Sequence, residues 1–81
     1  MNIYVGNLNY KVGENNLKEA FGEYGTVETV KIIQDKISNR SKGFAFVEMP
    51  DDHEGQQAID NLNGTEFMGR KMVVNVARAR E

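Results

Sequence analysis

The chain has 81 residues, the length of one small domain, and we expect residues 1–81 to fold as a single domain. It has no cysteine, which excludes disulfides and thiolate metal sites, and no apolar run approaches the roughly 20 residues of a membrane-spanning helix. The formal net charge of −2 argues, taken alone, against a nucleic-acid-binding domain, because such domains are typically basic. The first residues lack a secretory signal, so we expect a soluble cytoplasmic protein with no membrane partner.

The first half of the chain is predicted to form a strand, a helix and a second strand. Residues 3–8 are a short apolar run of strand-forming residues. Apolar residues within 14–24 recur at the spacing of one helix face, with Gly13 as the expected N-cap and Gly25 as the C-terminal stop. Residues 27–34 are interpreted as the second strand.

The second half repeats this order as strand, helix and strand. Residues 43–49 are predicted as the third strand and residues 71–77 as the fourth. Between them, residues 51–63 carry a helical stripe that opens with Asp51 and Glu54 in the spacing of a capping box. The order β-α-β-β-α-β predicts an α+β, ferredoxin-like sandwich: a four-stranded antiparallel sheet with both helices on one face.

The charges are distributed unevenly over these elements. The two predicted helices carry seven acidic residues and one basic residue, whereas the rest of the chain carries nine basic and five acidic residues. Because the screening length at physiological salt is roughly 8 Å, a polyanion could approach the sheet side while the acidic helices point away. Acidic helix faces that are simply solvated would give the same asymmetry.

The sheet face that the helices leave bare is predicted to carry three aromatic side chains. Side chains alternate between the two faces of a strand, so placing the aliphatic neighbours in the core turns Tyr4, Phe44 and Phe46 outward. Each exposed phenylalanine forgoes roughly 1.5–3 kcal/mol of burial, and a clustered apolar patch usually marks a binding site. The opposite alternation would bury the phenylalanines and expose the aliphatic residues between and after them, which is less favourable.

Cations and amides are expected around these rings. The surrounding candidates are Asn7, Lys31, Ile33, Arg40, Lys42, Glu48, Asn75, Ala77 and Arg78. The cations can contact phosphates, and the amides of Asn7 and Asn75 can read base edges because an amide both donates and accepts. Glu48 can accept from a base amino group or keep the patch soluble, and both readings stay open. The same alternation places Val76 of the fourth strand in the core. Flat rings suit unpaired bases, at about 1–3 kcal/mol per stack.

Two segments resemble the signatures of a known family. The octamer at residues 42–49, KGFAFVEM, is similar to the pattern K/R-G-F/Y-G/A-F-V-x-F/Y of the RNA recognition motif (RRM) family, and the hexamer at residues 3–8, IYVGNL, is similar to its second signature. The resemblance covers nearly all of the chain and extends to the stand-alone members of bacteria and organelles. It implies that the three rings stack two or three bases, that Lys42 contacts the RNA backbone, and that the fourth strand and Arg78 contribute.

The function that this resemblance implies is a non-catalytic module that binds single-stranded RNA in post-transcriptional regulation. Three positions depart from the family pattern. Gly13 replaces the usual Ser or Thr cap. Met49 replaces an aromatic residue but faces the core, and Gly55 replaces an alanine, which predicts a locally soft second helix or an unusually close helix–sheet contact.

Other functions are weighed against this one. A protein-interaction domain of the same fold usually lacks the sheet rings, and a single-stranded DNA binder is an alternative because contacts to 2′-hydroxyl groups cannot be read from residue types. Acylphosphatases share the topology, but residues 9–13 lack the arginine of their phosphate loop. His53 is the sole histidine, so we expect no metal site and no cofactor. We expect a monomer whose partner is single-stranded RNA.

Overall fold

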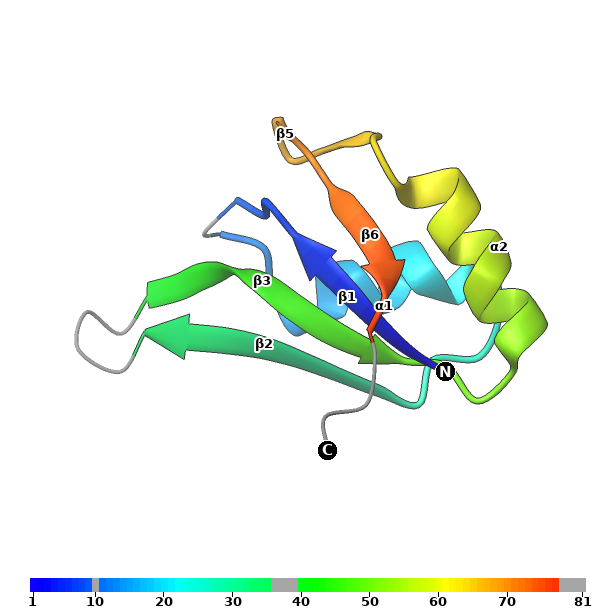
Figure 1. Ribbon diagram of the computed structural model, residues 1–81. Helices are drawn as coiled ribbons and strands as arrows, with labels where there is room; N and C mark the ends of the chain where they lie inside the picture. Colours follow the sequence, from blue (N-terminus) through cyan, green and yellow to red (C-terminus); the bar gives the residue numbers. More distant parts are fainter. Residues whose placement is uncertain (10, 36–39, 78–81) are drawn as a thin grey trace.

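The computed structural model describes residues 1–9, 11–35 and 40–77, with only the backbone described at residues 34–35 and 40–42. Each predicted element is present, with ends within a few residues of the prediction. In chain order the elements are β1 (Asn2–Gly6), α1 (Glu14–Gly22), β2 (Thr29–Asp35), β3 (Arg40–Glu48), α2 (Asp52–Leu62), β4 (Glu66–Phe67), β5 (Arg70–Lys71) and β6 (Val73–Val76) (Figure 1).

The four main strands form one antiparallel sheet in the order β2-β3-β1-β6. The strands that carry the two signature segments, β1 and β3, are therefore the central pair. Figure 1 shows both helices on the same side of the sheet, and no other element of the described chain covers the opposite side. This arrangement confirms the predicted α+β, ferredoxin-like sandwich.

The hydrophobic core lies between the sheet and the two helices. Its largest fully buried side chains are Phe21, Ile3, Leu17, Met49, Met72, Val5, Val47 and Val74. Those from β1 and β3 alternate with residues on the bare face, which confirms the predicted alternation, and Met49 packs in the core as expected. Neither helix of the described residues is long and apolar enough to cross a membrane.

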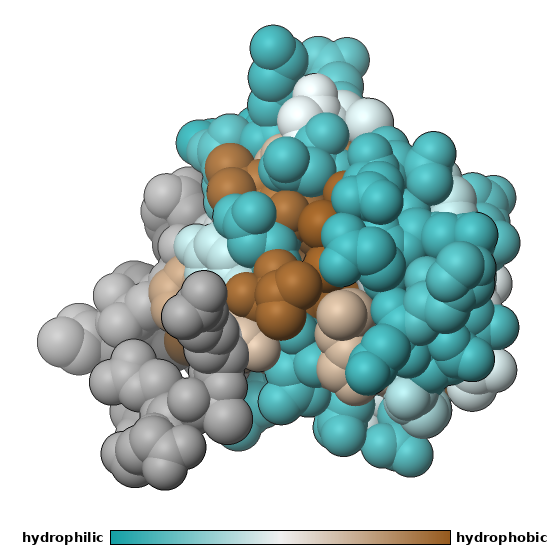
Figure 2. Space-filling model, turned by 45° about the vertical axis from the view of Figure 1, so that its right-hand side comes forward, coloured by the Kyte–Doolittle hydropathy of each residue, from teal (hydrophilic) through white to brown (hydrophobic). Residues whose placement is uncertain are grey.

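The segment before the last strand differs from the prediction. Instead of one strand over residues 71–77, β6 covers only Val73–Val76, and β4 pairs with β5 in a small hairpin that the sequence patterns do not indicate. Val76, expected in the core, is 48% exposed because it is the last residue of an edge strand with only β1 beside it. Figure 2 shows hydrophobic surface in the middle of its view, bordered by hydrophilic surface.

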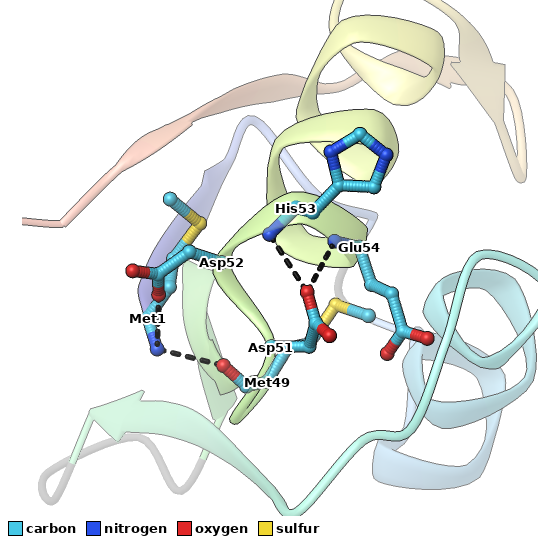
Figure 3. Close-up of polar contacts among 6 residues, drawn as sticks. All are labelled: Met1, Met49, Asp51, Asp52, His53 and Glu54. Atoms are coloured by element: carbon cyan, nitrogen blue, oxygen red, sulfur yellow. Dashed lines mark hydrogen bonds and ion pairs between the residues drawn. The ribbon is translucent and has the colours of Figure 1, made fainter.

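The start of α2 is fixed by side-chain and terminal contacts. Asp51 is the N-cap, and its Oδ1 accepts from the backbone N–H groups of His53 at 2.8 Å and Glu54 at 3.1 Å (Figure 3). The Met1 ammonium donates to the Met49 carbonyl at 2.7 Å. The Met1 side chain packs on Gly55 so closely that a Cβ there would lie 2.5 Å from Sδ. The close contact at Gly55 is therefore made by Met1, the residue before β1, and a locally soft second helix stays a prediction.

Of the predictions about the ends of α1, the N-cap is correct and the C-terminal stop is wrong. Gly13 is the N-cap of α1, as predicted, and its N–H donates to Asn16 Oδ1 at 2.8 Å. Gly25, however, does not end α1 in a left-handed conformation, because the helix already ends at Gly22. It lies under the Glu54 side chain, whose Oε1 accepts from the Thr26 N–H at 3.2 Å. The Glu54 carboxylate thus tethers the loop after α1 instead of completing a capping box at Asp51.

Candidate nucleic-acid interface

The bare face of the sheet carries the three predicted aromatic side chains as one cluster. The ring centroids of Tyr4 and Phe44 are 6.0 Å apart, those of Tyr4 and Phe46 5.9 Å, and those of Phe44 and Phe46 6.1 Å. Phe46 is 37% exposed, and the other two rings are half-buried against their neighbours. Their tilted and edge-to-face contacts stabilise the rings on the surface while leaving ring surface open to a ligand. We call these three residues the aromatic platform.

The aromatic platform belongs to a row of side chains that crosses the whole sheet. Lys31 of β2 pairs with Phe46 of β3, Phe46 pairs with Tyr4 of β1, and Tyr4 pairs with Asn75 of β6. All four residues lie on the bare face, because each is in register with its neighbour. With strands about 4.8 Å apart, the row is about 14 Å long. It offers one cation, two rings and one amide in sequence, with Lys31 and Asn75 exposed at its ends.

A second and a third row flank this one. On one side Ile33 pairs with Phe44, and Gly6 pairs with Val73, which is 42% exposed. On the other side Glu48 pairs with Asn2 and Thr29, and its side chain is exposed. The structure therefore places the predicted Ile33 and Glu48 at opposite ends of the aromatic platform.

The Tyr4 ring lies over Gly6, two residues along the same strand. A Cβ at Gly6 would lie 2.5 Å from Tyr4 Oη and 2.8 Å and 2.9 Å from ring carbons Cε2 and Cζ, closer than real Cβ contacts. Gly6 is buried although it faces outward, because the ring covers it. Because Gly6 has no side chain, the Tyr4 ring can lie against the backbone of the sheet at this position.

Asn7 is engaged within the chain. Its backbone has φ 58°, and its side chain donates from Nδ2 to the Lys71 carbonyl at 2.6 Å and accepts at Oδ1 from Arg70 at 2.8 Å. Asn9 adds a bond from Nδ2 to the Met68 carbonyl at 3.1 Å. The predicted reading of base edges by Asn7 stays a prediction, and the amide has one N–H left for it.

The remaining predicted residues lie around the sheet or beyond the description. Ala77 is half-buried, and its N–H donates to the Asn2 carbonyl at 2.8 Å, which extends the pairing of β6 with β1. Arg40 and Lys42 lie on β3, but their side chains are outside the described part of the structure, as is the whole of Arg78. Their predicted phosphate contacts stay predictions.

The charge pattern expected from the sequence is present among the described residues. The acidic side chains of both helices are exposed, apart from the half-buried Glu54. In the described part of the chain, the single ion pair joins the Met1 ammonium to Asp52 Oδ1 at 3.5 Å. Lys31, Arg70 and Lys71 are exposed with no described carboxylate in ion-pair range, so these cations are available to an anionic ligand.

The sequence patterns did not indicate the β4–β5 hairpin, which brings Arg70 and Lys71 to Asn7. Each strand of the hairpin has two residues, too few to show a period. The signal that could have found it is the dipeptide Met68-Gly69 between Phe67 and Arg70, because two-residue turns ending in glycine are typical of hairpins.

Comparisons with known proteins show the family of the chain. The family model of the RNA recognition motif matches residues 3–73. RbpB of Nostoc sp. is 49% identical over 81 residues, which are 100% of this chain and 79% of that protein. The crystal structure of RNA-binding protein PG1 has a TM-score of 0.94 and 47% identity, with 100% of this chain and 98% of that chain covered. The structure titled "Sxl-lethal protein/RNA complex" has a TM-score of 0.88 and 35% identity, with 94% of this chain and 47% of that chain covered. The chain therefore belongs to the RNA recognition motif family.

Proposed function

We propose that the chain binds single-stranded RNA by stacking two or three unpaired bases on the aromatic platform. The observation that carries this proposal is the mutual contact of Tyr4, Phe44 and Phe46 on a sheet face that no described element covers. Unpaired bases offer flat faces of matching size, and stacking on aromatic side chains is the means by which RRM sheets hold them. The similarity to a chain solved as a protein/RNA complex supports the same ligand.

The row from Lys31 to Asn75 supplies the polar contacts. Lys31 lies at the β2 end of the row, where its ammonium can reach the phosphate that links stacked nucleotides. Asn75 lies at the β6 end, opposite Tyr4, where its amide can pair with the edge of a base. An RNA strand bound along the row would thus meet the ammonium group, the two aromatic rings and the amide in turn.

The expected affinity follows from these contacts. Two or three stacked bases at about 1–3 kcal/mol each provide several kcal/mol before the cost of ordering the strand. A lone domain with few cations should therefore bind in the micromolar range, near −8 kcal/mol. The dependence on salt should be shallow, because few phosphates are neutralised.

The test is the double variant Phe44→Ala, Phe46→Ala, titrated with a short labelled single-stranded RNA. Each lost stack should weaken binding by about 5- to 150-fold. Both rings lie on the surface side of β3, so circular dichroism and thermal unfolding should show a retained fold. A matched control is Phe21→Leu in the core, which should lower stability while leaving the affinity of the folded fraction unchanged. Wild-type binding by a folded double variant would refute stacking as the mechanism.

We further propose that the chain acts as a non-catalytic monomer in the cytoplasm, in post-transcriptional regulation. The surface cations and the stacking rings support binding, and a relative that the chain matches over its full length is named as an RNA-binding protein. Equal affinity for a DNA oligonucleotide of the same sequence would widen the proposal to single-stranded DNA. Light scattering with and without RNA tests the monomer, and a dimer would contradict it.

A further inference from the structure

The β4–β5 hairpin is fastened to the end of β1 by three side-chain hydrogen bonds. Its strands pair Glu66 with Lys71 and Phe67 with Arg70. Asn7 Nδ2 bonds the Lys71 carbonyl, Asn7 Oδ1 accepts from the Arg70 guanidinium, and Asn9 Nδ2 bonds the Met68 carbonyl. We call these three bonds the clasp. They join residues that are 59 to 64 positions apart in the chain.

The clasp places a cation at the end of the aromatic platform. Asn7 directly follows Gly6, which pairs with Val73 at the start of β6, and the Leu8 N–H donates to the Gly43 carbonyl at 2.8 Å. Gly43 precedes the platform residue Phe44. The end of β1, Gly43 within β3 and the hairpin therefore lie close together at one edge of the sheet, where an RNA strand that leaves the aromatic platform would pass.

The Arg70 guanidinium is held but not neutralised. It donates one hydrogen bond to the neutral Asn7 amide at 2.8 Å, and no described carboxylate lies within ion-pair distance of it. A guanidinium has five N–H donors in a rigid fork, so the remaining donors can bind a phosphate while Asn7 fixes their direction. Loss of side-chain freedom on binding is smaller for a group already held in place.

We propose that Arg70 is a phosphate-binding residue of the RNA interface and that Asn7 is its positioning residue. This inference rests on the proposed function, because it concerns the backbone of the same single-stranded RNA. It assigns the Asn7 amide to the hairpin instead of to a base. The nucleotides that it concerns lie beyond the stacked ones, at the edge where Gly6 pairs with Val73.

The test compares salt dependence among Asn7→Gly, Arg70→Ala and the double variant, with a short labelled single-stranded RNA of mixed sequence. Glycine at position 7 accepts the φ of 58° and removes only the amide. Arg70→Ala should weaken binding about two- to fivefold at low salt and reduce the slope of log K against log salt by about 0.7, the value of one phosphate on a single strand. Asn7→Gly should do the same in part, and the double variant should match Arg70→Ala.

Controls separate this inference from folding and from stacking. Arg70→Gln keeps a donor for Asn7 Oδ1 but removes the charge, so it should show the same reduction of about 0.7 in the slope as Arg70→Ala while thermal unfolding stays unchanged. Lys18→Ala removes an exposed cation from α1, on the helix side, and should leave the slope as in wild type. The double variant Phe44→Ala, Phe46→Ala should lose affinity but keep the slope, so failure of stacking and failure of the clasp give different results.

Two outcomes would overturn the inference. An unchanged slope in both Arg70→Ala and Arg70→Gln would show that the hairpin does not contact the RNA backbone. Additive losses in the Asn7→Gly, Arg70→Ala double variant, with the Asn7→Gly loss equal at all salt concentrations and dependent on base sequence, would show that Asn7 contacts a base itself.

Discussion

Replacement of Gly6 by alanine tests whether the orientation of the Tyr4 ring is what the interface uses. The added Cβ would lie 2.5 Å from Tyr4 Oη and under 3.0 Å from two ring carbons. Carbon atoms pack favourably at about 3.5–4.0 Å, so the ring must lift by about an ångström. The backbone of Gly6 has no left-handed φ that would itself oppose alanine. The substitution therefore acts on one side chain of the platform.

The expected effects on binding and on stability have opposite signs. A lifted ring loses its stack, about 1–3 kcal/mol, so affinity for single-stranded RNA should fall by about 5- to 150-fold. Alanine instead of glycine reduces the freedom of the unfolded chain, which adds about 0.4–1 kcal/mol of stability when the folded backbone accepts it. The melting temperature should thus stay level or rise while binding weakens.

Fluorescence anisotropy with a short labelled RNA measures the first effect, and thermal unfolding measures the second. Gly22→Ala is the matched control, because a Cβ at this exposed helix position meets nothing within 4 Å. It should raise stability by about 0.5–1 kcal/mol and leave binding unchanged. The reasoning fails if Gly6→Ala binds within twofold of wild type while Tyr4→Ala does not, because the ring would then bind bases in some other orientation.

Two further predictions concern stability. Asp51→Ala removes the acceptor for the N–H groups of His53 and Glu54, so it should lower the free energy of unfolding by about 0.5–2 kcal/mol in urea titrations. Asp51→Asn should retain most of the wild-type stability, because its side-chain oxygen can still accept these bonds. Equal losses in both variants would contradict the capping role. Met68 has φ 51° in the turn before Gly69, a left-handed backbone conformation that asparagine adopts more readily than methionine. Met68→Asn should therefore raise the free energy of unfolding by up to about 1 kcal/mol. A loss of stability would contradict this reasoning and would show that the exposed Met68 side chain makes stabilising contacts.

The bare face was predictable because buried aliphatic residues alternate with outward-facing residues along the central strands β1 and β3. The aliphatic residues that alternate with Phe44 and Phe46 are fully buried. Only one of the two possible alternations along β3 buries them, and it turns both phenylalanines outward. The outward position of the three rings followed from this choice without knowledge of register. The cross-strand row did not, because the partner of Tyr4 on each side depends on strand pairing that no single segment encodes.

The missed features depend on contacts between distant segments or on single backbone angles. The first strand was expected to reach Leu8 but ends at Gly6, where Asn7 turns into a left-handed conformation. Gly25 looked like a helix stop, yet its small size serves the close approach of Glu54 from the other helix. Alternation alone also could not show that Val76 lies at an open edge of the sheet.

The alignment of the row from Lys31 to Asn75 depends on the backbone hydrogen bonds between the strands. Each of its four members comes from a different strand, so none can shift relative to the others without breaking strand pairs. A slip of one residue between β1 and β3 would turn Tyr4 toward the helices and break up the cluster. Backbone pairing thus aligns the proposed binding groups before any ligand arrives, so RNA binding should be lost in the same cooperative transition that melts the sheet.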